Sequence, residues 1–156
     1  TKKILEGHTK IDAIIETSNL LILIEIKFTS DISPYTKFGL ARNQIARIID
    51  VGIDEIKRSN RNKLIVLLST PAELFQRRNR LYFYKIQDYS ENLNIQKDVP
   101  WRNISEINEN LLKVTWISLE KVIQTIYRKA EKFLDEEELM AVKKFFKERK
   151  LWLAKA

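Results

Sequence analysis

The most informative pattern in the chain is a run over residues 20–28 that is apolar on both of its alternating faces. Such a run is typical of a strand in the middle of a sheet that is covered on both sides. Two charged residues, Glu25 and Lys27, interrupt it. A lone buried charge costs several kcal/mol unless it is paired or binds a metal, so both need a partner. The pattern therefore predicts a buried strand that carries a charged site.

A shorter apolar stretch over residues 10–17 precedes this run and predicts the other strand of a hairpin. If the two residues between the strands form the turn, Asp12 pairs with Glu25 across the hairpin. Side chains that face each other in this way lie roughly 5 Å apart at Cβ. Because side chains alternate along a strand, Lys27 emerges on the same face as Glu25. We therefore expect Asp12, Glu25 and Lys27 to converge.

Two carboxylates at this distance repel each other unless a proton or a cation lies between them. Hard oxygen ligands suit Mg²⁺ or Mn²⁺, so a divalent ion is the expected cofactor. The alternative is a solvated group of ion pairs on an open sheet face, which is the usual fate of charges on strands. The metal site is favoured by apolar residues on the same face, namely Ile14, Leu21 and Leu23.

Patterns further along the chain predict an α/β fold. Apolar residues at helical spacing over residues 38–49 predict a helix that ends near Gly52. Residues 63–69 predict a third strand, which runs parallel to residues 20–28 because a helix connects the two. Thr70 is then expected to cap a following helix.

The second half of the chain predicts less regular structure, followed by helices. The polar residues 90–110 show no steady period and predict a loop or short irregular structure, and residues 113–117 predict a last strand. Ser118 is expected to open a helix that runs towards residue 133. An acidic start at residues 135–138 predicts a final helix that ends near residue 152, so the chain is expected to close with a helical hairpin.

Length and composition predict one domain with a core over about residues 1–117 and C-terminal helices over about residues 118–153. The chain begins with Thr1 and no Met, so we expect a fragment or a processed form that lacks an N-terminal segment. The chain has no cysteine, which excludes disulfides and thiolate metal sites and fits a reducing compartment such as the cytoplasm. The apolar run is too short to cross a bilayer, so no membrane partner is expected.

The charge of the chain favours a polyanionic partner. Lys and Arg number 28 against 21 Asp and Glu, for a net charge of +7, which is a weak indication of nucleic acid. Two groups of arginines are candidates for phosphate contacts, one on a predicted loop and one on a predicted helix: Arg58 and Arg61, then Arg77, Arg78 and Arg80. The alternative for each group is a solvated cationic surface.

The residues of the predicted hairpin resemble a known family. An aspartate at position 12, then Glu25-Ile26-Lys27, then a helix carrying Gln44 are similar to the PD-(D/E)XK nuclease superfamily. Restriction endonucleases, Holliday-junction resolvases and recombination nucleases share this metal-dependent core. The resemblance covers roughly residues 6–68. It implies a restriction-endonuclease-like core, with a mixed four-stranded sheet flanked by helices.

The resemblance also implies a role for each matching residue. Asp12 and Glu25 would bind the metal through their carboxylates, and Ile26 would contribute its carbonyl. Lys27 would be the catalytic lysine, and Gln44 would flank the site. Many members carry an acidic residue ahead of the first strand, which makes two further residues candidates for the site: Glu6 and His8.

The expected function is metal-dependent hydrolysis of phosphodiester bonds in DNA, and many such enzymes act as homodimers. An ammonium group has no lone pair with which to accept a proton, so we expect Lys27 to act through its charge. Two alternatives remain open. The chain is a catalytically silent nuclease-like domain that binds nucleic acid or a protein partner, or it is an interaction module whose basic C-terminal hairpin docks another subunit.

Overall fold

A computed structural model describes residues 9–35 and 42–148 of the chain. It divides into two compact units, Thr1–Trp116 and Ile117–Ala156. The candidate site lies in the first unit, and each unit is described by itself below.

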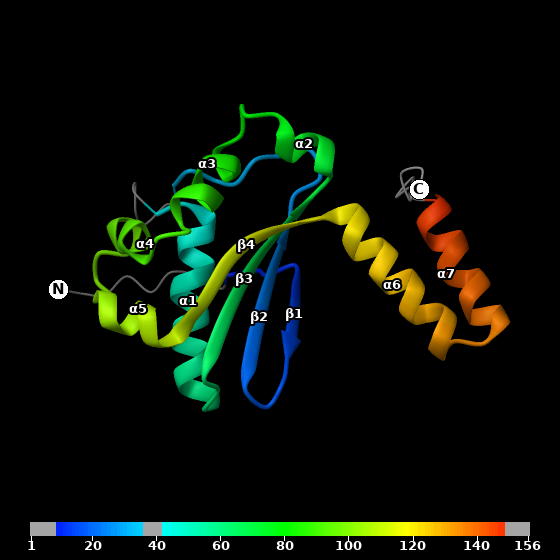
Figure 1. Cartoon of the computed structure of the whole chain (residues 1–156), viewed down its shortest axis with the longest axis horizontal. Coiled ribbons are helices and arrows are strands. Elements are labelled where there is room, and N and C mark those ends of the chain that lie inside the picture. The colour runs from blue at the N-terminus through cyan, green and yellow to red at the C-terminus, as the bar shows by residue number, and fades with distance from the viewer. Residues whose placement is uncertain (1–8, 36–41, 149–156) are drawn as a thin grey trace. The chain divides into compact units, whose positions relative to one another are not determined.

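The described strands form one mixed sheet in the order β1-β2-β3-β4 (Figure 1). They are β1 (Ala13–Glu16), β2 (Leu20–Ile26), β3 (Lys63–Thr70) and β4 (Leu111–Ser118). Strand β1 is antiparallel to β2, whereas β3 is parallel to β2. The α/β class and the mixed four-stranded sheet with flanking helices are therefore confirmed.

The β1–β2 hairpin has the predicted register. Ala13 pairs with Ile24, and the pairing continues in the same register up to the turn. The N–H of Thr17 donates to the carbonyl of Leu20 over 2.9 Å and closes a turn of two residues. The first strand is shorter than expected, because it begins at Ala13. Asp12 thus lies just outside the ladder.

Helix α1 (Gln44–Ser59) connects β2 to β3 and packs on one face of the sheet. It begins later than predicted, at Gln44, and ends later, at Ser59, so Gly52 lies in its interior rather than near its end. Residues 38–41 of the predicted helix fall outside the described residues. A Cβ atom at this position would lie 2.7–2.9 Å from methyl groups of Leu64 and Leu23. Gly52 therefore serves close packing of α1 on the sheet, and Asn60, with a positive φ of 55°, ends the helix instead.

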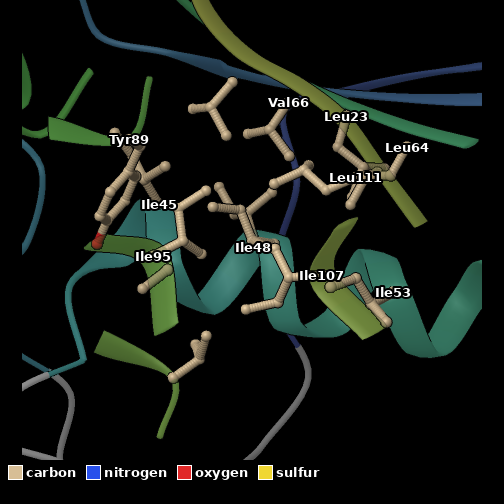
Figure 2. Packing of buried hydrophobic residues seen from close by; sticks show 14 of the residues in the cluster. Leu23, Ile45, Ile48, Ile53, Leu64, Val66, Tyr89, Ile95, Ile107 and Leu111 are labelled. Atoms are coloured by element: carbon tan, nitrogen blue, oxygen red, sulfur yellow. The ribbon is translucent and has the colours of Figure 1, made fainter. Parts of the chain in front are cut away.

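The core of the first unit lies between the sheet and α1. Figure 2 shows side chains of Leu23, Leu64 and Val66 on the strands pointing towards Ile48 of α1. The opposite face of β2 is less covered, because Ile26 on that face is 40% exposed. The expectation that β2 is buried on both faces is therefore wrong for the described part of the first unit.

Four short helices follow β3: α2 (Ala72–Gln76), α3 (Leu81–Asp88), α4 (Asn92–Asp98) and α5 (Ile104–Asn110). The loop predicted over residues 90–110 is wrong, because this stretch forms α4 and α5. Each of these two helices is seven residues long and buries one isoleucine, Ile95 or Ile107. Helices of two turns with a single buried residue show no readable period.

The helix after β3 starts differently from the prediction. Pro71, not Thr70, is the N-cap of α2, and no side chain caps it. Thr70 ends β3, and its hydroxyl accepts a hydrogen bond from the indole N–H of Trp116 over 2.9 Å. The cap prediction for Thr70 is therefore wrong, since its side chain is already engaged.

The second unit contains the predicted helical hairpin of α6 (Leu119–Phe133) and α7 (Glu136–Glu148). Ser118 caps α6 by accepting a hydrogen bond from the N–H of Lys121 over 3.1 Å. Asp135 and Glu138 accept hydrogen bonds from each other's backbone N–H and form a capping box. None of the described helices in either unit is long and apolar enough to span a membrane.

The N-terminus of α1 is fixed by a buried side chain, Asn43. Its Oδ1 accepts hydrogen bonds from the N–H groups of Ile45 and Ala46. Its Nδ2 donates to the hydroxyl of Tyr89 over 2.5 Å and to Asp98 over 3.0 Å. One amide therefore caps the helix and also joins it to the segment that carries α3 and α4.

We predict that Asn43→Ala lowers the free energy of unfolding by about 2 kcal/mol, because the variant loses a helix cap and leaves buried polar partners unpaired. Asn103 is the matched control, since it caps α5 through one N–H group from an exposed position. Asn103→Ala is expected to cost about 1 kcal/mol. Urea unfolding of both variants measures the difference, and equal losses would contradict the dual role of Asn43.

Candidate active site

Glu25 is the centre of the candidate site and is only 3% exposed. The ammonium nitrogen of Lys27 lies 2.7 Å from Oε1 of Glu25. Gln44 donates to the same oxygen from Nε2 over 2.6 Å. The other carboxylate oxygen, Oε2, is buried and has no hydrogen-bond partner among the described residues. One oxygen of this carboxylate is thus held by two donors, whereas the other has none among the described residues.

Gln44 reaches Glu25 because α1 begins beside the segment that follows β2. The N–H of Gln44 donates to the carbonyl of Ser33 over 2.9 Å. In return, the side-chain carbonyl of Gln44 accepts a hydrogen bond from the N–H of Ser33 over 3.4 Å. Because the side-chain carbonyl of Gln44 already accepts this hydrogen bond, the side-chain nitrogen is the group that faces Glu25.

Asp12 lies just before β1 and contacts the end of β2 with its side chain. Its Oδ2 accepts a hydrogen bond from the N–H of Ile26 over 2.8 Å, so the carboxylate takes the place of the next ladder bond. The N–H and C=O of one strand residue point to the same side, so the carbonyl of Ile26 also faces Asp12. The structure brings Asp12, Glu25 and Lys27 together as the hairpin register predicts.

The electrostatics of the site centre on the buried carboxylate. Burial raises the pKa of Glu25 above its ordinary value of 4.5; the hydrogen bond and charge of Lys27 oppose this shift, and the negative charge of Asp12 adds to it. The net shift is upward, so Lys27 and Gln44 only partly offset the loss of water around the charge. An additional cation at Oε2 would favour the ionised form.

The donor set fits a hard divalent cation. It consists of the open oxygen of Glu25, the carboxylate of Asp12 and the carbonyl of Ile26, all of which are oxygen ligands of the kind that Mg²⁺ and Mn²⁺ take. Within residues 9–35 and 42–148, no cluster of three or more His, Cys, Asp or Glu side chains is arranged to hold a metal. A cation here would therefore rely on two carboxylates, and Mg²⁺ commonly keeps several water ligands in such sites.

The other predicted site residues are two candidates near the N-terminus and five arginines on other segments of the chain. Glu6 and His8 fall outside the described residues. Arg58 lies in the last turn of α1, not on a loop, and Arg61 follows that helix near the β1–β2 turn. Arg77, Arg78 and Arg80 do not share a helix as predicted, because they occupy the connection between α2 and α3.

Two residues that hold the site in place were not expected from the sequence. Ser33 anchors Gln44 through its backbone, which leaves no side-chain signal to read. Asn43 caps the helix that begins with Gln44, and asparagine just ahead of an apolar helical pattern is a recognisable N-cap signal. The sequence therefore identifies Asn43 as a candidate N-cap, whereas no residue type indicates the backbone contacts of Ser33.

No protein-family model, no curated protein and no solved structure matches this chain. The resemblance to the PD-(D/E)XK superfamily therefore stays a prediction from a few residues, and the argument for function depends on the geometry of the site.

The raised pKa of Glu25 predicts a specific pH dependence of stability. The folded protein holds this proton more tightly than the unfolded chain, so the stabilisation by protonated Glu25 is complete below pH 4.5 and is lost as pH rises through the folded pKa. Without divalent metal, the wild-type protein should therefore lose stability relative to Glu25→Gln as pH rises from 4.5 to 8. Urea unfolding across this range measures the difference.

Glu106 provides a control of opposite sign. A hydrogen bond from Lys57 lowers its pKa below 4.5, so its contribution is present above that pH and is lost as pH falls through the folded pKa. The difference between wild type and Glu106→Gln should be constant from pH 5 to 8. A constant difference for Glu25→Gln over the same range would show that its carboxylate has an ordinary pKa.

Proposed function

We propose that this protein is a metal-dependent nuclease that hydrolyses phosphodiester bonds of DNA. The observation that carries the proposal is the buried Oε2 of Glu25, which has no hydrogen-bond partner in the described chain. The other oxygen of the same carboxylate binds Lys27, and the negative charge of Asp12 acts on the group. An oxygen of a buried carboxylate without a partner costs stability. A bound cation would supply the partner that the described residues do not.

Each residue has a role that follows from its contacts. Glu25 and Asp12 would hold Mg²⁺ or Mn²⁺, with the carbonyl of Ile26 as a further ligand. Bound there, the cation would supply positive charge that stabilises the additional negative charge on the phosphate in the transition state. Lys27 is largely buried, and its ammonium group would stabilise the same charge or orient the attacking water. Gln44 has no titrating group and would position Glu25 and that water.

We predict that Asp12→Ala, Glu25→Ala and Lys27→Ala each reduce cleavage by about a hundredfold or more. The first two would remove ligands of the cation, and the third removes the ammonium group that would stabilise the transition state. The assay follows cleavage of plasmid and labelled oligonucleotide DNA with Mg²⁺ or Mn²⁺. The panel should contain linear, forked, cruciform and single-stranded substrates, with an RNA strand for comparison.

Glu16→Gln is the matched control for this assay. It removes a carboxylate from the same hairpin, at the end of the sheet near the turn, where Glu16 pairs with Arg61. Its cleavage rate should equal that of wild type. Cleavage that survives in all three site variants would refute the assignment of the active site.

A second prediction separates metal binding from catalysis. Mn²⁺ affinity, measured by electron paramagnetic resonance or calorimetry, should fall in Asp12→Asn and Glu25→Gln. It should be retained or rise severalfold in Lys27→Met, because the ammonium group that neutralises Glu25 is removed. Lys63→Met is the control. Lys63 lies at the start of β3, whereas Lys27 lies beside its end, and the ammonium group of Lys63 donates to the backbone carbonyl of Glu109. A loss of affinity in Lys27→Met would contradict the competition of cation and lysine for one carboxylate.

The second candidate function is a nuclease-like domain that binds nucleic acid or a protein without cutting. It is favoured by the small number of protein ligands, because the described residues offer two carboxylates and no third acidic side chain at the site. Mn²⁺ binding without cleavage of any substrate in the panel would select this alternative.

A further inference from the structure

The connection between α2 and α3 carries three arginines, two of which form no ion pair with any described residue. We infer that this turn, residues 77–80, contacts the phosphate backbone of the same nucleic acid strand that enters the candidate active site. The inference rests on the proposed function, because the candidate active site defines which nucleic acid strand is meant. Its test, however, measures binding alone. The turn is called the arginine turn hereafter, and it contains Arg77, Arg78 and Arg80.

The arginine turn lies at the same end of the sheet as Glu25 and Lys27. Strands β2 and β3 are parallel, and the N–H of Lys27 donates to the carbonyl of Ser69 over 2.9 Å. The chain enters α2 directly after β3 ends. Figure 1 shows α2 at the end of β3 that is opposite the β1–β2 turn. The strand that supplies Lys27 and the strand that leads to the turn thus end side by side.

A second connection sets an upper limit on the distance between the arginine turn and Lys27. Asp31 accepts hydrogen bonds from the N–H groups of Leu81 and Tyr82 over 2.6 Å and 3.2 Å, directly after Arg80. Asp31 lies four residues after Lys27, a stretch that spans at most roughly 14 Å. With the Asp31 side chain and its hydrogen bond added, the backbone of Arg80 lies within roughly 20 Å of Lys27.

The turn is held on a rigid base. The hydroxyl of Tyr84 donates to the carbonyl of Arg78 over 2.7 Å. On α2, the ring of Phe75 stacks on Trp116 with ring centroids 4.1 Å apart, and it also stacks on Tyr82 of α3. Both helices that flank the turn are thereby fixed to the sheet. The backbone of the turn would therefore lose little conformational entropy when an anion binds the arginines.

The two groups of arginines differ in whether their charge is already neutralised. Arg58 pairs with Glu55, and Arg61 pairs with Glu16 and donates to a backbone carbonyl. In the arginine turn Arg77 pairs with Glu73. Arg78 and Arg80 form no ion pair with any residue of the described ranges, and Arg78 is exposed. The structure therefore favours the arginine turn over Arg58 and Arg61.

The distance limits where the contact falls on the substrate. Phosphates of one strand of duplex DNA follow one another every 3.4 Å or so along the axis, so roughly 20 Å corresponds to about six nucleotides. The arginine turn should therefore contact a phosphate within about six nucleotides of the scissile bond. A nucleic acid strand is the partner that carries charges at this regular spacing.

The test compares two double variants with the same loss of charge, Arg78→Ala/Arg80→Ala and Arg58→Ala/Arg61→Ala. Fluorescence anisotropy gives the affinity for a labelled 20-nucleotide duplex at several salt concentrations and without divalent metal, so that no cleavage occurs. The first variant should bind at least tenfold more weakly, with a salt slope reduced by about two, one for each lost phosphate contact. The second should bind nearly as wild type.

Two further measurements make the inference specific. Tyr84→Phe keeps every charge but releases the carbonyl of Arg78, and it should weaken binding severalfold at the same net charge. A neutral methylphosphonate moved along the strand should weaken wild-type binding at one position within six nucleotides of the scissile bond. At that position it should have no effect on Arg78→Ala/Arg80→Ala, because the contact is already lost.

The outcomes separate this inference from the nuclease proposal. If the two double variants lose equal affinity, or if the salt slope of Arg78→Ala/Arg80→Ala is unchanged, the arginine turn is a solvated surface and the inference is overturned, even if wild type cleaves DNA. If wild type cleaves nothing but the slope falls by about two in that variant alone, the contact stands and the nuclease proposal fails.

Discussion

The arrangement of the first unit depends on one unfavourable event, the burial of the Glu25 carboxylate at the end of β2. A charge in that position needs partners, and the fold supplies two donors, Lys27 and Gln44, but it also brings a second negative charge, Asp12, close to the site. Lys27 approaches from the same strand, Gln44 from the start of α1, and Asp12 from the neighbouring strand of the hairpin. Each of these contacts requires a different part of the fold to be correctly placed. The hairpin pairing, the start of α1 and the end of the parallel β2–β3 pair are therefore coupled through a single side chain, of which one oxygen still lacks a partner.

The part of this arrangement that the sequence predicts is the part set by local rules. A period of two along the strands and a turn of two residues leave one register for the hairpin, and the observed pairing of Ala13 with Ile24 follows it. The contact of Asp12 with the N–H of Ile26 does not follow from such rules, because it depends on where the ladder stops. Similarly, the sequence places Gln44 on a helix but does not indicate the backbone of Ser33 that orients it. Local pattern thus predicts which residues approach, whereas the contacts between backbone and side chain decide how they are oriented.

Other errors have the same origin in non-local packing. Residues 20–28 contain apolar side chains on both faces, but only the face of Leu23 is fully buried within the described first unit, and the face of Ile26 is not. The period of a strand reports how apolar a face is, and it does not report whether another layer covers it. Gly52 was expected near a helix end because glycine often lies there, whereas here it serves the close approach of α1 to the sheet. Propensity describes what a residue tolerates, and the tertiary structure determines which of those options is used.

The distribution of charge carries more information than its sum. The 28 Lys and Arg residues include cations that are already neutralised, such as Arg102, whose guanidinium group pairs with Asp50, Asp54 and Glu106 and joins α1 to α5. Such groups attract no further anion, because their charge is used within the fold. Arg78 and Arg80 have no described partner, although Asp31 lies in contact with the N–H of the residue that follows them. That carboxylate caps α3 rather than binding a guanidinium group. An arrangement that leaves neighbouring like charges on a rigid base gains no stability from them, so an anion from outside the chain is the partner that their charge would suit.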